Sequence, residues 1–204
     1  MRPAVFLDRD GTIIKQVHHL NRVEDVMVYP FAADALREFQ AAGFATVIVT
    51  NQSAIGRGLL DEAGLKQIHE EMFRQLGSRH CIDGIYYSTT VPVCGDPWVV
   101  EDVWRKPGPG MLERAAEDLG ILLNESWMIG DAISDMLAGR HAGCRGTVLV
   151  RTGYGHRITQ ADTVIDHTTD NLLTAARLIL KLSSLHQPSS DQTPQNHSGI
   201  QHNH

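Results

Sequence analysis

The stretch that decides the fold reads Ala4-Val5-Phe6-Leu7-Asp8-Arg9-Asp10-Gly11-Thr12-Ile13. An apolar run, short and without helical periodicity, ends abruptly in two aspartates and a turn. This pattern predicts a buried β-strand that stops at Asp8. Ligands of open α/β sheets bind beyond the carboxyl ends of the strands, so Asp8 and Asp10 are expected at a ligand-binding edge. Asp and Gly are also ordinary turn residues, and the rest of the chain has to decide between the two interpretations.

Strands and helices alternate along the rest of the chain. Further strands are predicted at 44–49, 82–87, 126–131, 147–150 and, at an edge, 163–165; helices are predicted at 30–43, 61–76, 111–119, up to about 143, and 171–182. A flexible glycine-flanked loop is expected at 54–58 and a long irregular loop at 88–103. The alternation predicts an α/β fold with a doubly wound, mainly parallel, Rossmann-like sheet and helices on both faces. Residues 1–182 form one domain, and the Ser-, Gln- and His-rich residues 183–204 are expected to be a disordered tail.

Composition excludes several classes of protein. The 204 residues carry a net charge of −6 without a basic stripe, so nucleic acid is not an expected partner. No apolar run reaches membrane-spanning length, and the first strand leaves no room for a signal peptide. Cys81, Cys94 and Cys144 lack metal-binding spacing and are odd in number, which favours a reducing, cytoplasmic location. A monomer is the expected state.

Polar groups gather where three predicted strands end. In a parallel sheet these ends meet at one edge. Lys106 lies just before a proline that starts a helix, and helix N-termini attract anions. Taken singly, these residues have ordinary explanations as turn residues, helix caps or a solvated lysine. Their coincidence predicts a single site that contains Asp8, Asp10, Thr50, Asn51, Lys106, Asp131 and Asp135.

The residue types at this edge indicate the chemistry. Several carboxylates without His or Cys partners favour a hard cation, and Mg²⁺ fits because it takes oxygen ligands and keeps positions for water and phosphate. The Thr50 hydroxyl, the Asn51 amide and the Lys106 ammonium suit phosphate oxygens. A carboxylate nucleophile that forms an aspartyl-phosphate is an established solution for such substrates. The set predicts Mg²⁺-dependent hydrolysis of a phosphomonoester.

Four segments, in order and spacing, resemble the motifs of the haloacid dehalogenase (HAD) superfamily: 8–12, 50–53, 105–107 and 130–135. The resemblance implies that Asp8 is the nucleophile and Asp10 the general acid and base, because a leaving alkoxide needs a proton. It implies that Thr50 and Lys106 bind the phosphoryl group. Mg²⁺ would be held by Asp8, the Asp10 carbonyl and Asp131, with Asp135 in support.

More narrowly, segments 6–13, 49–53, 56–58, 84–87 and 105–111 resemble the D-glycero-D-manno-heptose 1,7-bisphosphate 7-phosphatases and the related histidinol-phosphate phosphatases. These are small enzymes without a large cap domain, which agrees with the short interval between Asp8 and Thr50. The resemblance implies removal of the 7-phosphate of a small phosphorylated sugar. It places Arg105 on the second phosphate, with further substrate contacts near Gln52, Ser53, His18 and His19; the two histidines can equally be solvated loop residues.

One departure from that family concerns the long loop. Its members usually bind a structural zinc there through a Cys-x-His and a Cys-x-Cys pair. The corresponding positions here are Ser88, Thr90, Asp102 and Trp104. Two hydroxyls, a carboxylate and an indole cannot form a closed zinc site. We therefore expect no structural zinc and expect Trp98 and Trp104 to pack the loop instead.

Three other functions stay open. Histidinol phosphate or another small phosphomonoester is the main alternative substrate. A 3′-end nucleic-acid phosphatase shares the core motifs, but the acidic charge disfavours it. A non-catalytic binding module would require a lost nucleophile or acid, whereas Asp8 and Asp10 are both present.

His69 is expected on the apolar face of its helix rather than as a ligand.

Overall fold

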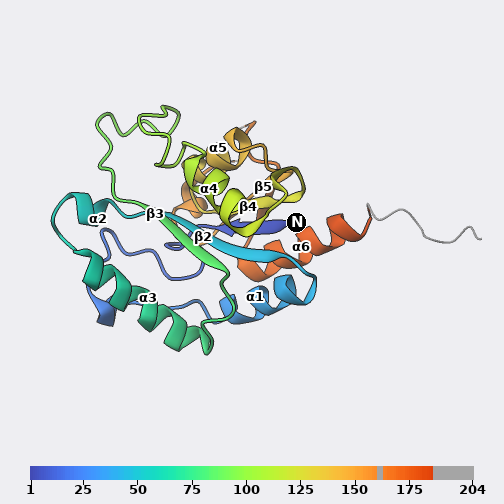
Figure 1. Ribbon diagram of the computed structural model, residues 1–204, viewed down its shortest axis with the longest axis horizontal. Helices are drawn as coiled ribbons and strands as arrows, with labels where there is room; N and C mark the ends of the chain where they lie inside the picture. The colour runs from blue at the N-terminus through green and yellow to red at the C-terminus, as the bar shows by residue number, and fades with distance from the viewer. Residues whose placement is uncertain (160–162, 186–204) are drawn as a thin grey trace, which may run out of the picture.

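The sheet lies at the centre of a computed structural model that describes residues 1–159 and 163–185 (Figure 1). Six strands pair in parallel in the order β3-β2-β1-β4-β5-β6. Their bounds are β1 Ala4–Leu7, β2 Ala45–Asn51, β3 Gly84–Ser88, β4 Trp127–Gly130, β5 Gly146–Val150 and β6 His167–Thr169. The doubly wound parallel sheet predicted from the alternation is confirmed.

Helices cover both faces of this sheet (Figure 1). The helices are α1 Ala32–Ala41, α2 Ser53–Gly56, α3 Glu62–Leu76, α4 Gly110–Leu119, α5 Ile133–His141 and α6 Leu172–Ser184, with short 3₁₀ turns at Val23–Asp25, Leu123–Glu125 and Gly153–Arg157. One core cluster joins the sheet to α1, α3 and α6, and a second joins it to α4 and α5. A sheet with parallel strands requires such cover because both of its faces are apolar.

Strand β1 shows why the opening stretch organises the fold. Val5 and Leu7 point into the core on the α1 side, and Ala4 and Phe6 point into the core on the α4 side. All four side chains are fully buried. β1 also lies between β2 and β4, so its carboxyl end is flanked by the ends of both neighbours. The residue that follows, Asp8, is therefore placed at the middle of the sheet edge.

Two local predictions are wrong. The edge strand is β6 at His167–Thr169 and not residues 163–165. Side-chain hydrogen bonds, and not a strand ladder, join residues 163–166 to β5. Thr147 N donates to Asp166 Oδ2 at 2.9 Å, and Thr147 Oγ1 donates to Val164 O at 2.8 Å. The expected loop at 54–58 contains helix α2. Helix α6 continues to Ser184, and residues 186–204 of the expected tail lie outside the described part of the chain.

No helix in the described ranges is both long enough and apolar enough to span a bilayer.

Candidate active site

One cavity of about 180 Å³ opens at the carboxyl ends of β1, β2 and β4. Every predicted site residue except Arg105 lines it: Asp8, Asp10, His18, His19, Thr50, Asn51, Gln52, Ser53, Lys106, Asp131 and Asp135. Arg105 lines an adjoining cavity of about 150 Å³, which shares Asn51, Lys106 and Ser134 with the first. The structure thus brings all the predicted residues to one edge of the sheet, with Arg105 displaced to one side.

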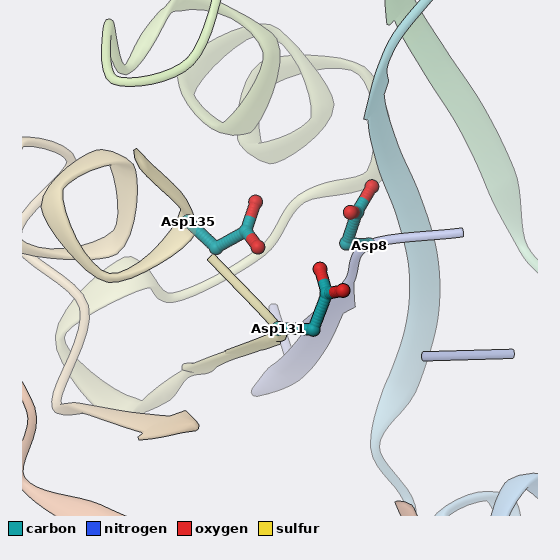
Figure 2. A group of neighbouring side chains, drawn as sticks. All are labelled: Asp8, Asp131 and Asp135. Carbon is teal, nitrogen blue, oxygen red and sulfur yellow. The ribbon is translucent and has the colours of Figure 1, made fainter. Parts of the chain in front are cut away.

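Three carboxylates converge in this cavity (Figure 2). Asp8 follows β1, Asp131 follows β4 and Asp135 lies in the first turn of α5; one oxygen of each lies within 4.8 Å of the others. Burial, together with the nearby carboxylates, raises the pKa of Asp131 to about 8 and that of Asp135 to about 6. Such a cluster of oxygen donors fits a hard divalent cation, which would favour the ionised forms.

A buried ammonium offsets part of this negative charge. Lys106 Nζ lies 2.9 Å from Asp8 Oδ1 and 2.6 Å from Asp135 Oδ1, and it donates to Val49 O at 2.8 Å. Burial disfavours the charge on Lys106, but the two carboxylates outweigh burial and hold its pKa above the usual range. Lys106 is therefore a fixed positive charge next to the predicted nucleophile.

Asp10 lies outside the three-carboxylate cluster. Its Oδ2 accepts hydrogen bonds from Arg9 Nη2 at 2.8 Å and from Gln52 Nε2 at 3.0 Å. Its predicted metal contact therefore rests on the main-chain carbonyl and stays a prediction. The sequence analysis assigned no role to Arg9, whose side chain is fully buried in the structure. An arginine two residues after a buried apolar strand is itself a signal, because a buried arginine requires an acidic partner.

Asn51 and Gln52 both contact neighbouring site residues. Asn51 Nδ2 donates to Lys106 O at 3.0 Å, and Lys106 N donates to Asn51 Oδ1 at 3.1 Å. Both ends of the Asn51 amide thus hold the main chain of Lys106. Gln52 Nε2 also donates to Thr50 Oγ1 at 2.9 Å. The substrate contacts predicted for Asn51 and Gln52 stay predictions, whereas their role in positioning Lys106 and Thr50 is visible in the geometry.

Two glycines hold Asp131 in place, a contact that was not predicted from the sequence. Gly11 has φ +82° and Gly153 has φ +55°, a region that other residues rarely adopt. A Cβ on Gly11 would lie 2.1 Å from Asp131 Oδ2, and one on Gly153 would lie 1.9 Å from the same atom. Tyr154 N donates to Asp131 Oδ2 at 2.6 Å. The main chain therefore closes around this carboxylate.

Replacing Gly153 by alanine is expected to displace the Asp131 carboxylate, because the added methyl overlaps its oxygen. We expect activity to fall about 100-fold or more and the rise in Tm caused by added Mg²⁺ to shrink. Gly143→Ala is the matched control: Gly143 also has a positive φ of +75°, but nothing lies within 4 Å of its added Cβ. Thermal unfolding with and without Mg²⁺ separates the two variants. Equal Mg²⁺ responses in both would contradict this role of Gly153.

The long loop after β3 is held by polar contacts. Thr90 Oγ1 donates to Asp102 Oδ2 at 2.5 Å, and Glu101 accepts from the main-chain N–H groups of Val93 and Cys94. The expectation that both tryptophans pack this loop is wrong: Trp98 is 48% exposed and Trp104 is 38% exposed. Trp104 contributes instead through its indole N–H, which donates to Tyr87 O at 2.9 Å. The expectation of no zinc stays a prediction.

Comparison with known proteins agrees with this geometry. The parallel sheet, the aspartates at its edge and the buried lysine define the class of HAD-like hydrolases, and a family model described as HAD-hydrolase-like matches residues 103–175. The D-glycero-beta-D-manno-heptose-1,7-bisphosphate 7-phosphatase of Escherichia coli (strain K12) is 42% identical over 74% of this chain and 80% of its own length. That of Pasteurella multocida (strain Pm70) is 39% identical over 75% of this chain and 84% of its own length. The chain belongs to this heptose bisphosphate phosphatase family.

The structural comparison gives the same family. The crystal structure of the D,D-heptose 1,7-bisphosphate phosphatase from B. bronchiseptica, complexed with magnesium and phosphate, superposes with a TM-score of 0.76. It shares 27% identity, and the match covers 88% of this chain and 99% of that chain.

Proposed function

We propose that this chain is a Mg²⁺-dependent phosphatase that removes the 7-phosphate of D-glycero-D-manno-heptose 1,7-bisphosphate. The observation that carries the proposal is the Asp8 carboxylate, held 2.9 Å from a buried lysine at the centre of the sheet edge with two further carboxylates beside it. Membership of the heptose bisphosphate phosphatase family supports the substrate. The substrate of the relatives is named in their own descriptions, and its transfer to this chain is the proposal.

The mechanism starts from the Asp8–Lys106 pair. One Asp8 oxygen attacks the phosphorus of the 7-phosphate, a P–O bond forms to Asp8, and the bond to the sugar oxygen breaks. Lys106 holds Asp8 Oδ1 and offsets negative charge as the phosphoryl group approaches. The Asp10 carboxyl gives its proton to the leaving alkoxide, and the resulting carboxylate then takes a proton from the water that hydrolyses the aspartyl-phosphate. Asp8 is regenerated and inorganic phosphate leaves.

A divalent cation fits the three clustered carboxylates, all of which offer oxygen atoms. Asp8, Asp131 and the Asp10 carbonyl would hold Mg²⁺, with Asp135 in support. When bound, it would neutralise charge on the phosphoryl oxygens and favour the ionised form of Asp131. The main chain at Gly11, Gly153 and Tyr154 packs against Asp131 and fixes the orientation of its carboxylate. This fixed orientation supports a metal-binding role for Asp131.

The proposal assigns Arg105 to the second phosphate of a bisphosphate. It lines the cavity next to the main one, and its Nη1 donates to Thr90 O at 2.8 Å, which fixes the side chain toward that cavity. The guanidinium is suited to paired phosphate contacts. His18, His19 and Ser53 line the main cavity and complete the proposed sugar-binding surface.

Arg105→Ala is expected to raise KM for a bisphosphate about 10- to 100-fold, since charge-assisted hydrogen bonds to a phosphate contribute roughly 1.5–3 kcal/mol. The KM for a substrate with one phosphate should change by less than about threefold. Steady-state phosphate release from both substrates measures this. Arg114→Ala, an exposed arginine on α4, serves as the control. An equal rise in KM for both substrates would contradict the assignment of Arg105 to the second phosphate.

A substrate panel tests the proposed function directly. It contains both anomers of the heptose 1,7-bisphosphate, histidinol phosphate, other sugar phosphates and a 3′-phosphorylated oligonucleotide, each with Mg²⁺. We expect kcat/KM above about 10⁴ M⁻¹s⁻¹ for one heptose anomer, a common value for a true substrate. A higher kcat/KM on histidinol phosphate would overturn the proposed substrate assignment. If none of these compounds were hydrolysed, the proposed phosphatase activity would be overturned.

Two features of the protein's setting belong to the proposal. The three cysteines are free, with Cys81 buried, which supports a reducing, cytoplasmic location. A monomer is proposed as the working state of the protein.

A further inference from the structure

We propose that His69 is a positioning residue for catalysis: through the buried side chain of Arg9, it sets the orientation in which Asp10 delivers its proton to the leaving group. This inference rests on the proposed function, because it concerns the proton transfer assigned to Asp10. His69 lies on α3, sixty residues from Arg9 along the chain, and it does not line the main cavity. Its effect on the reaction would therefore pass through Arg9.

Arg9 is joined to Asp10 by a forked contact. Arg9 Nη2 donates to Asp10 Oδ2 at 2.8 Å and to Oδ1 at 3.1 Å, and Arg9 Nε donates to Oδ2 at 3.2 Å. The planar guanidinium thereby fixes the plane of the carboxyl as well as its position. Gln52 Oε1 accepts from Nη2 at 3.0 Å. The side chain of Arg9 has no exposure to solvent, and that of Asp10 is 15% exposed.

The opposite end of the guanidinium is held by His69. Arg9 Nη1 lies 3.2 Å from His69 Nε2. A guanidinium has only donors, so Nε2 must accept, and the ring proton must lie on Nδ1. Burial and the charge of Arg9 lower the pKa of His69 to about 3, which favours the neutral ring near pH 7. His69 is thus an acceptor that anchors Arg9 to α3.

This chain of contacts matters most when the leaving group needs a proton. Loss of the His69 acceptor leaves Arg9 Nη1 buried without a partner on that side, and the guanidinium must shift or tilt to recover one. Asp10 would follow, because three of the guanidinium contacts are to its carboxyl. Formation of the aspartyl-phosphate from an alkyl phosphate is sensitive to that displacement, because an alkoxide needs a proton, whereas p-nitrophenolate leaves without protonation. Both substrates share the later hydrolysis of the aspartyl-phosphate, in which Asp10 acts as the base, so the comparison uses kcat/KM, which reports only the steps through formation of that intermediate. The expected signature is therefore a dependence on the leaving group.

The test compares wild type, His69→Leu and His69→Gln on two substrates, a heptose 1,7-bisphosphate and p-nitrophenyl phosphate. Correct acid–base catalysis contributes about 10²–10⁴ in rate, so partial misplacement in His69→Leu should lower kcat/KM about 10- to 100-fold on the sugar phosphate. The kcat/KM of the same variant on p-nitrophenyl phosphate should fall by less than about threefold. His69→Gln, which can offer an amide oxygen to Arg9, should recover most of the lost activity.

Tyr87→Phe is the matched control. The Tyr87 ring packs edge-on against His69, with ring centroids 6.5 Å apart, and the hydroxyl that this change removes donates to Glu62. The activity of Tyr87→Phe on both substrates should match wild type. If His69→Leu does not fold, His69→Asn, whose shorter side chain keeps polarity but not reach, replaces it in the same comparison.

Equal losses on both substrates, or no recovery in His69→Gln, would show a merely structural role and overturn the inference. Asp10→Asn separates this failure from failure of the proposed function. If Asp10→Asn loses activity selectively on the sugar phosphate and His69→Leu does not, only the inference fails. If Asp10→Asn shows no selectivity, or wild type hydrolyses neither substrate, the proposed mechanism fails as well.

Discussion

Asp8→Asn is expected to abolish phosphate release, with kcat reduced about 10⁴-fold or more, since loss of a catalytic nucleophile has effects of that size. An amide nitrogen or oxygen cannot replace the carboxylate in forming an aspartyl-phosphate. The fold should be preserved, because Asn has nearly the same shape and Lys106 keeps its 2.6 Å contact with Asp135. Removing one of three clustered carboxylates also relieves repulsion, so Tm should be unchanged or higher.

Steady-state phosphate release and thermal unfolding measure the two halves of this prediction. Asp34→Asn is the control: Asp34 is an exposed aspartate that pairs with Arg37 on α1, and its replacement should leave activity unchanged. Turnover of Asp8→Asn within about tenfold of wild type, on protein shown to be free of deamidated product by mass spectrometry, would remove Asp8 as the nucleophile.

Lys106→Met is expected to lower both activity and stability. Methionine fills a similar volume, but it leaves Asp8 and Asp135 in a buried site without their shared ammonium. Removing one partner from a buried ion pair costs about 3–5 kcal/mol of the free energy of unfolding. Catalysis should fall about 10²- to 10³-fold or more, because a positioned positive charge next to the phosphoryl group is lost.

Urea unfolding with and without Mg²⁺ measures the effect on stability. Excess Mg²⁺ should restore part of the loss in Lys106→Met, because a bound cation stabilises the folded state and offsets the uncompensated carboxylates. Lys66→Met, an exposed lysine on α3, should stay within about 0.5 kcal/mol of wild type. A Lys106 variant as stable as Lys66→Met would mean that the carboxylates do not depend on this ammonium.

The main elements of the fold could be predicted because their apolar patterns are strong. β1 is a fully buried run, and α3 shows helical spacing with Leu65, Ile68 and Met72 on one buried face. β6 could not be predicted in this way, because it is a three-residue edge strand of polar residues. The preceding residues 163–165 include the apolar Val164 and Ile165 and therefore carried the stronger strand signal. Helix α2, with four residues, is too short to show a period.

The candidate site could be predicted as a set because a parallel sheet brings its strand ends together whatever the details of packing. The contacts between side chains could not. The hydrogen bond between Arg9 and His69 depends on how α3 packs against the end of β1. The two hydrogen bonds between Asn51 and the main chain of Lys106 join residues 55 positions apart. Gly153 came close to Asp131 only through the turn after β5. No local spacing encodes these distances.

The loop between β3 and α4, green in Figure 1, lines the proposed substrate cavity but contributes few residues to the proposed reaction. Asp8, Asp10 and Asp131 follow the ends of β1 and β4, and Thr50 lies near the end of β2. Residues 89–104, in contrast, form the wall of the adjoining cavity and stop just before Arg105 and Lys106. Most of this loop is exposed, and polar pairs such as Thr90–Asp102 hold it. Exchange of the loop as a cassette is therefore a route for laboratory evolution toward other phosphate esters, with the hydrolytic machinery left in place.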